Sequence, residues 1–161
     1  MKSKLENCIH GNALVYQGRG ILILGSPRSG KSDLSLRLIE RGAILIADDL
    51  VRIEQENGSL VAYADPEFQG LLEVSGVGFI RVQGHSKAIL NLVLELGQET
   101  EDNRLPRPQK FMRYGVELPQ FNFNPWIPSW HARLGVILGN IGLIVNDEDL
   151  SQPLLKMKSS Q

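Results

Sequence analysis

The sequence is poor in cysteine, in net charge and in long apolar runs, and each shortage excludes a class of protein. Cys8 is the single cysteine among 161 residues, which excludes an intramolecular disulfide and a cysteine-based zinc site. The 17 Lys and Arg residues against 18 Asp and Glu residues give a formal net charge of −1, so the chain has no general basic field for nucleic acid. No apolar run approaches the length of a membrane span.

The composition predicts one globular domain. Hydrophobic residues make up 42% of the chain and charged residues 22%, and a chain of this length can bury one continuous core. The N-terminal segment carries Glu6, Asn7 and His10 in place of an unbroken apolar stretch, so it does not resemble an export signal. We expect a cytoplasmic protein that binds neither membrane nor nucleic acid, with a single domain over residues 1–145 and a polar tail over residues 146–161.

Three segments predict a βαβ unit. The continuous apolar runs Gly20–Leu24 and Ala43–Ala47 are typical of strands buried on both faces. Between them, Lys31–Arg41 lacks Pro and Gly, is rich in leucine and is followed by Gly42, a suitable helix stop. We expect a mixed α/β fold in which the residues after both strands lie at the same edge of the sheet.

The remaining segments are predicted to be mostly strands. Asn57-Gly58 is a strong signal for a hairpin turn. The other expected elements are a hairpin of Val51–Ile53 with Leu60–Tyr63, strands over Leu71–Val74, Phe79–Val82 and Ala88–Leu96, a strand region Phe111–Phe123 bent at Tyr114-Gly115, and a last helix beginning near Pro128.

The stretch GSPRSGKS, residues 25–32, fits the phosphate-loop pattern G-x-x-x-x-G-K-[ST]. Such a loop directs backbone N–H groups at a phosphate, while its lysine adds positive charge and its serine hydroxyl is a ligand for Mg²⁺. An ordinary strand-to-helix turn is the alternative interpretation. The residues expected to bind nucleotide are Gly25, Ser26, Pro27, Arg28, Ser29, Gly30, Lys31, Ser32 and Asp33.

Asp48 and Asp49 follow the second predicted strand, 17 and 18 residues after Lys31. Two adjacent carboxylates beside a phosphate loop can divide the work, one holding Mg²⁺ and the other taking a proton from an acceptor hydroxyl. The alternative is a pair of aspartates that cap a turn. His10, which precedes the apolar stretch Ala13–Val15, is a candidate to hydrogen-bond a catalytic carboxylate.

Taken together, His10-Gly11, the loop GSPRSGKSDLSLRLIERGA, the pair in LIADD and the segment LLEVSGVGFIRV resemble the C-terminal catalytic domain of HPr kinase/phosphorylase, in its short proteobacterial form. The resemblance covers about residues 8–140. It implies a phosphate-loop fold like that of phosphoenolpyruvate carboxykinase. It also implies ATP and Mg²⁺ as cofactors, an HPr-type phosphocarrier protein as the serine substrate, and a ring-like homo-oligomer.

The resemblance also implies roles for single residues. Asp48 would be the catalytic base, assisted by His10 and Lys31. The metal would be held by Ser32 together with Asp49 and Glu73. Arg104 would contact the transferred phosphate, or else be a solvated loop residue, and Arg133 is a weaker candidate for the same contact.

Two departures from the family pattern leave a second function open. Ser75 stands where the family usually has an arginine, and Pro27-Arg28 replaces a pair of small residues in the loop, where Arg28 returns some positive charge. The leading interpretation is a serine kinase, with phosphorolysis as an open second activity. The alternatives are an ATP-binding regulatory module with weak or no phosphotransfer and a small-molecule kinase.

Overall fold

The computed structural model of the protein describes residues 5–97 and 109–140. The predicted tail and the loop that carries Arg104 lie outside these ranges. Within them, no helix combines the length and apolarity that a membrane crossing requires. The elements are β1 (Cys8–His10), β2 (Asn12–Tyr16), β3 (Arg19–Gly25), α1 (Lys31–Glu40), β4 (Ile44–Ala47), β5 (Leu50–Glu56), β6 (Ser59–Tyr63), β7 (Leu71–Val74), β8 (Gly78–Arg81), β9 (Lys87–Ile89), β10 (Leu92–Leu96), β11 (Gln109–Arg113), β12 (Val116–Phe123) and α2 (Trp130–Asn140).

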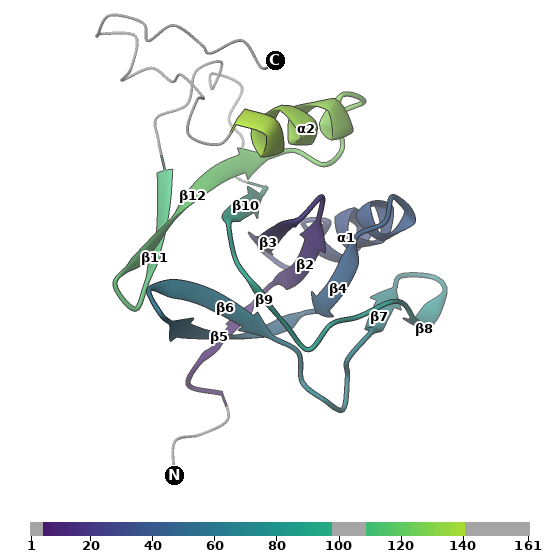
Figure 1. The fold of residues 1–161 in the computed structure, drawn as a ribbon. Helices are drawn as coiled ribbons and strands as arrows, with labels where there is room; N and C mark the ends of the chain where they lie inside the picture. The colour runs from purple at the N-terminus through teal and green to yellow at the C-terminus, as the bar shows by residue number, and fades with distance from the viewer. Residues whose placement is uncertain (1–4, 98–108, 141–161) are drawn as a thin grey trace, which may run out of the picture.

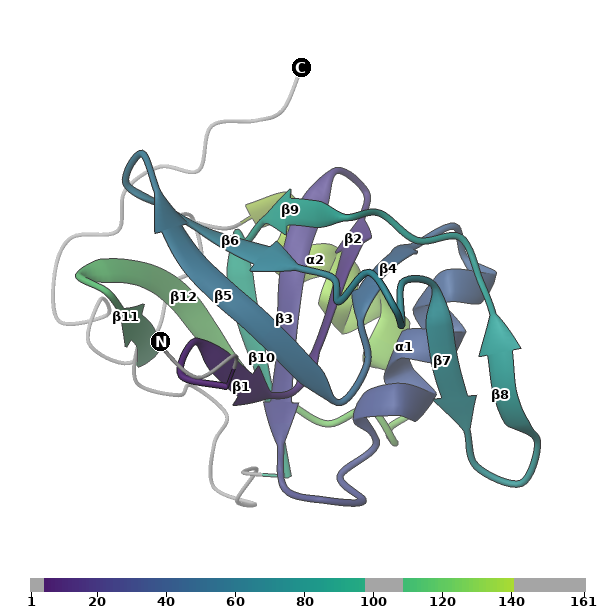
Figure 2. The same ribbon diagram turned by 90° about the horizontal axis from the view of Figure 1, so that it is seen from below.

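The described residues form three layers (Figure 1). A six-stranded sheet in the order β11-β12-β10-β3-β2-β4 lies in the middle, and α1 and α2 cover one of its faces. A four-stranded sheet in the order β1-β5-β6-β9 crosses the other face, as Figure 2 shows from below. The third sheet is the hairpin β7-β8, which stands beside α1 at the edge of the molecule.

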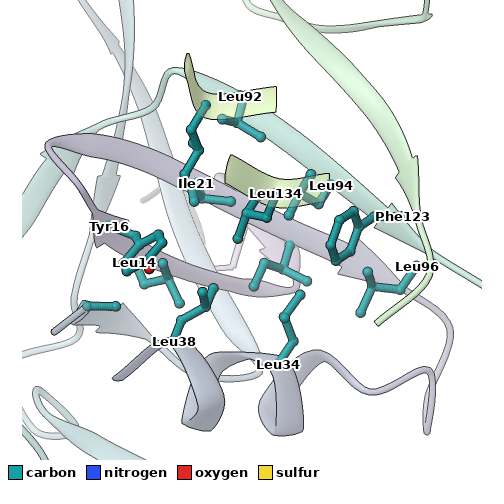
Figure 3. Packing of buried hydrophobic residues seen from close by; sticks show 13 residues of the cluster. Leu14, Tyr16, Ile21, Leu34, Leu38, Leu92, Leu94, Leu96, Phe123 and Leu134 are labelled. Atoms are coloured by element: carbon teal, nitrogen blue, oxygen red, sulfur yellow. The ribbon is translucent and has the colours of Figure 1, made fainter. Parts of the chain in front are cut away.

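The central sheet is buried on both faces, which explains the continuous apolar runs in the sequence. In β3, Ile21 and Ile23 pack with Leu34 of α1 and Leu134 of α2 on the helix side (Figure 3). Leu22 points to the other side, where the two larger sheets pack on each other. The predicted strand Gly20–Leu24 and the predicted helix after it are confirmed, and the buried core fixes both elements at the base of the loop between them.

The strand β2 lies between β3 and β4 and is antiparallel to both, so β3 and β4 run in the same direction. Their carboxyl ends therefore meet at one edge of the sheet, as the sequence predicts. The sequence analysis did not place β2 between them. This order makes the sheet mixed and puts residues 11 and 12, at the start of β2, between the loop after β3 and the aspartates after β4.

One predicted strand is wrong, because Ala88–Leu96 is divided between two sheets. β9 belongs to the four-stranded sheet and β10 to the six-stranded sheet, with the change at Leu90, which donates to Leu60, and Asn91, which donates to Gly20. A Cβ at Gly20 would lie 1.9 Å from the carbonyl oxygen of Ile89, so only glycine permits this crossing. The apolar pattern continues through the change of sheet because Leu90 and Leu92, on either side of Asn91, are both buried. The predicted hairpin of Val51–Ile53 with Leu60–Tyr63 and the last helix are confirmed. The strands predicted over Leu71–Val74 and Phe79–Val82 form the hairpin β7-β8, and the bent region Phe111–Phe123 forms the hairpin β11-β12.

Candidate active site

The loop between β3 and α1 leaves the N-terminus of the helix open for an anion. Gly30 is the N-cap residue, with a left-handed φ of 103° and no side-chain cap. In the part of the chain that the structure describes, the N–H groups of Gly30, Lys31 and Ser32 donate to no backbone oxygen. The left-handed φ of Gly30 favours glycine, and a Cβ there would lie 2.7 Å from the ring of Trp126 and would have to displace that exposed ring. Free N–H groups at a helix start form an anion-binding site.

Arg28 adds a cation at this loop in a strained conformation. Its φ of 65° is left-handed, which costs a residue with a Cβ about 1–2 kcal/mol. This explains why the pattern favours a small residue at that position. The Arg28 side chain is exposed and lines the pocket described below, so it adds positive charge next to Lys31.

Lys31 lies over the loop that precedes it. Its Nζ donates to the carbonyl oxygens of Gly25 at 2.9 Å and Ser26 at 3.0 Å. Glu95 lies on the neighbouring strand β10, paired with Leu24. Burial raises the pKa of Glu95 above its ordinary value, while the positive charge of Lys31 acts in the opposite direction. Glu95 is a carboxylate near the loop that the sequence analysis missed; its position at the end of a parallel strand is a signal that could have found it.

The two aspartates have different surroundings. The Asp48 carboxylate accepts three hydrogen bonds: from the Ser32 hydroxyl at 2.8 Å, from Nδ2 of Asn12 at 2.9 Å and from the backbone N–H of Glu73 at 3.0 Å. Asp49 is exposed, and its backbone has a left-handed φ of 69°. Asp48 is therefore tied to the loop helix and to β7, while the Asp49 carboxylate stays open to solvent.

A pocket of about 520 Å³ lies at this edge of the sheet. It brings together most of the predicted loop residues, one of the two aspartates and the hairpin that carries Glu73 and Ser75. Its lining residues are Pro27, Arg28, Gly30, Lys31, Ser32, Asp33, Leu36, Asp49, Glu73, Val74, Ser75 and Trp126.

Other predicted site residues do not line this pocket, or lie outside the residues that the structure describes. His10 is exposed at the end of β1, and its imidazole makes no hydrogen bond within residues 5–97 and 109–140. Arg133 is exposed on α2, where its Nε donates to Ser129 Oγ at 3.1 Å. Arg104 lies outside the described residues. Only the peptide after His10 reaches the site, because Gly11 N donates to Asp49 O at 3.0 Å.

Two buried polar residues next to the site were missed by the sequence analysis. Asn12 and Ser35 are fully buried, and Nδ2 of Asn12 donates to Ser35 Oγ at 3.0 Å. A polar residue inside the otherwise apolar stretch that begins β2 is a signal that could have revealed Asn12. For Ser35, the signal is its position on the face of the predicted helix that turns away from solvent.

The glycine-rich strand–loop–helix unit and the carboxylates beside it lie at one edge of a mixed α/β domain. Residues 3–121 match the family model described as the HPr Serine kinase C-terminal domain. The chain therefore belongs to this family, as the resemblance in the sequence implied.

Individual relatives agree with this assignment. The chain is 38% identical over 107 residues to HPr kinase/phosphorylase 1 of Oceanobacillus iheyensis, covering 62% of this chain and 34% of that protein. It is 32% identical over 132 residues to HPr kinase/phosphorylase of Malacoplasma penetrans, covering 74% of this chain and 44% of that protein. The aligned part is thus less than half of the length of these two curated relatives.

The fold also matches a solved structure. The HPr(Ser) kinase/phosphatase from Coxiella burnetii superposes with a TM-score of 0.74 at 26% sequence identity. The match covers 86% of this chain and 97% of that chain. The mixed α/β fold of the family is therefore shown for this chain.

Proposed function

We propose that this protein is a Mg-ATP-dependent kinase that phosphorylates a serine of an HPr-type phosphocarrier protein, with phosphorolytic removal of that phosphate as the reverse reaction in the same site. The observation that carries the proposal is one pocket shared by Lys31 of the loop, the open carboxylate of Asp49, and Glu73. The printed names of the relatives, HPr kinase/phosphorylase and HPr(Ser) kinase/phosphatase, support the same reaction and acceptor.

The nucleotide phosphates would bind at the start of α1. The open N–H groups of Gly30, Lys31 and Ser32 point to a phosphate there, and Lys31 exchanges its two carbonyl contacts for phosphate oxygens. Charge-assisted hydrogen bonds are stronger than those to a neutral carbonyl, so the exchange favours the bound nucleotide. Arg28, which also lines the pocket, supplies a second cation.

The donor set fits Mg²⁺. In the described part of the chain no group of three His, Cys, Asp or Glu side chains is arranged to hold a metal by itself. Mg²⁺ bound with a nucleotide does not need such a group, because phosphates and waters supply most of its ligands. The hydroxyl of Ser32, oriented by Asp48, and the carboxylate of Glu73 would hold it. When bound, the ion neutralises charge on the β and γ phosphates.

Asp49 is the better candidate for the catalytic base. The sequence analysis gave that role to Asp48 and a metal-binding role to Asp49, but the hydrogen bonds support Asp49 as the base and Asp48 as the residue that orients Ser32. Asp48 already accepts from three donors, whereas the Asp49 carboxylate is open toward the pocket. In the forward reaction the serine oxygen bonds to the γ phosphorus, the bond from that phosphorus to the β–γ bridging oxygen of ATP breaks, and Asp49 takes the serine proton.

Contributions of His10, Arg104 and Arg133 stay predictions. The exposed imidazole of His10 is one residue from Gly11, whose N–H holds the Asp49 carbonyl, which supports an assisting role beside the base. The role of Arg104 in contacting transferred phosphate rests on the family resemblance alone. Arg133 lies outside the pocket lining, which weakens its case.

Phosphotransfer itself is the direct test. The full chain is incubated with γ-labelled ATP, Mg²⁺ and HPr-type proteins from the same organism, and the labelled residue is identified by mass spectrometry. We expect a labelled serine, and we expect the label to be released as pyrophosphate when inorganic phosphate replaces ATP. Absence of label on every such partner, with ATP binding intact, would contradict the kinase proposal.

Trp126 is expected to report nucleotide binding. Its ring is 63% exposed, lines the pocket and lies against Gly30, so a phosphate at the loop changes its surroundings. Addition of ADP should change tryptophan emission, and Trp126→Phe should remove most of that change. The matched control is Trp130→Phe, since Trp130 packs under Arg37 and Arg41 and does not line the pocket. A signal that depends on Trp130 instead would place the nucleotide elsewhere.

A second candidate function is a nucleotide-responsive regulatory module, and the position of Ser75 favours it. Ser75 lines the pocket at the place where the family pattern has an arginine, so a cation is missing next to the transferred group. Ser75→Arg is expected to raise the transfer rate by about tenfold or more. The rate is measured in single turnover with saturating ATP. An inactive wild type with an active Ser75→Arg variant would favour the module, whereas an active wild type favours the kinase.

A further inference from the structure

The buried side chain of Asn12 is hydrogen-bonded to α1 and to the two aspartates that follow β4. Asn12 is 0% exposed at the start of β2, and a buried amide is costly unless it is paired. Its Nδ2 donates to Asp48 Oδ1 at 2.9 Å and to Ser35 Oγ at 3.0 Å, and it lies 3.4 Å from Ser32 Oγ. Its Oδ1 accepts from the backbone N–H of Asp49 at 3.0 Å. One amide therefore joins the loop helix to both aspartates.

The contact to the backbone of Asp49 holds an unfavourable conformation. A φ of 69° costs an aspartate free energy relative to the common backbone regions. Gly11 N donates to Asp49 O and Asn12 Oδ1 accepts from Asp49 N, so two successive residues hold the peptide groups before and after the Asp49 Cα. Strained residues persist where their surroundings determine the conformation, and here the surroundings are Gly11 and Asn12.

The contact to Asp48 orients the serine hydroxyl of the loop. Asp48 Oδ1 accepts from both Asn12 Nδ2 and Ser32 Oγ, so the amide fixes the carboxylate oxygen that directs the Ser32 hydroxyl. Partners that orient a metal ligand without touching the metal affect metal affinity through the ligand. An apolar side chain of similar volume would fill the space in β2 and would make none of these contacts.

We propose that Asn12 is a positioning residue that sets Asp48 and Ser32 for Mg-nucleotide binding and Asp49 for proton transfer. Its effect on transfer rests on the proposed function. Its effect on the metal-dependent part of nucleotide binding does not depend on which acceptor is used, and so it can be measured separately.

The experiment compares binding of ADP with and without Mg²⁺ by calorimetry, in wild type, Asn12→Ala and Asn12→Leu. For wild type we expect Mg²⁺ to tighten ADP binding. For both variants we expect this tightening to fall about 10- to 100-fold, with affinity for metal-free ADP within about threefold of wild type. A residue with a merely structural role would lower thermal stability and leave the ratio of the two affinities unchanged. Asn12→Leu keeps the branched shape of the side chain and leaves no cavity, so it serves if Asn12→Ala does not fold.

Asn91→Ala is the matched control. Asn91 Oδ1 also accepts from a backbone N–H, that of Gly20 at 2.8 Å, but at the opposite end of β3 from the loop. We expect a lower melting temperature and an unchanged effect of Mg²⁺. If Asn91→Ala loses the Mg²⁺ effect to the same degree as the Asn12 variants, the inference is wrong.

The outcomes separate this inference from the proposed function. The inference is overturned if Mg²⁺ tightens ADP binding as much in both Asn12 variants as in wild type. It is also overturned if Mg²⁺ has no effect on ADP binding in wild type. Loss of the Mg²⁺ effect in both variants supports it even if wild type labels no phosphocarrier, in which case only the proposed acceptor fails. Where wild type does transfer phosphate, the variants should also lower kcat about 10- to 100-fold, more than they raise the KM for ATP.

Discussion

Asp49→Asn is expected to lower the rate of phosphoryl transfer to the acceptor serine by about 10³-fold, because a carboxamide cannot accept the serine proton. The affinity for ATP should stay within about threefold of wild type. The side chains have the same shape, and the backbone of Asp49 is held by Gly11 and Asn12, which the substitution leaves in place. Single-turnover transfer and ATP binding, measured on the same preparation, give the two values.

The comparison of Asp49→Asn with Asp48→Asn decides which aspartate is the base. In Asp48→Asn an NH₂ group replaces one oxygen of a carboxylate that accepts from three donors. At least one of these donors must then point at the NH₂ group, which cannot accept its hydrogen bond. We expect that variant to lose thermal stability and Mg²⁺-dependent binding together. Asp65→Asn, in an exposed turn where Oδ1 accepts from Glu67 N, is the control with no expected effect on transfer. A stable Asp48→Asn that cannot transfer, beside an active Asp49→Asn, would restore the assignment made from the sequence.

Lys31→Met is expected to lower kcat/KM for ATP by about 10³-fold, since it removes a cation from the phosphates in both the ground state and the transition state. Methionine keeps much of the aliphatic length of lysine and cannot donate. The loss of two carbonyl contacts within the loop has a small effect on folding, because Gly25 O and Ser26 O lie at a partly exposed edge and can hydrogen-bond water. The effect should therefore appear in nucleotide binding and not in the stability of the nucleotide-free protein.

Thermal unfolding measures that difference. A ligand at 100 times its Kd stabilises the folded state by about 2.7 kcal/mol, which is roughly 5–10 °C for a chain of this size. Wild type should show this increase with ATP and Lys31→Met should show little. Lys110→Met is the control, because Lys110 pairs on the surface with Glu117, far along the chain from the loop. An ATP-induced increase in Lys31→Met equal to that of wild type would exclude the loop as the phosphate site.

The strand–loop–helix unit could be predicted from the sequence because each part is local. The apolar run before the loop, the Gly30-Lys31-Ser32 pattern and the stop at Gly42 specify a strand, a turn and a helix without information about distant residues. The same strand–helix–strand pattern predicted that β4 runs in the same direction as β3. The pair Asp48-Asp49 was therefore placed at the correct edge of the sheet.

The surroundings of each aspartate could not be predicted, because they depend on contacts between distant residues. Asp48 and Asp49 are adjacent and chemically identical, and the pattern of the chain does not say which one meets Ser32, 16 positions earlier, and which one meets solvent. The insertion of β2 between β3 and β4 decides this, and the sequence pattern of β2 does not reveal its neighbours. The same strand order brings Asn12 to the site.

The position of β2 also sets the width of the site. Neighbouring strands in a sheet lie about 4.8 Å apart, so one intervening strand separates the backbones of β3 and β4 by about 10 Å. The distance between the loop after β3 and the aspartates after β4 is then set by the sheet and not by a loop. Substitutions or insertions in the surface loops can alter what enters the pocket, while the span between these two sides of the pocket stays constant.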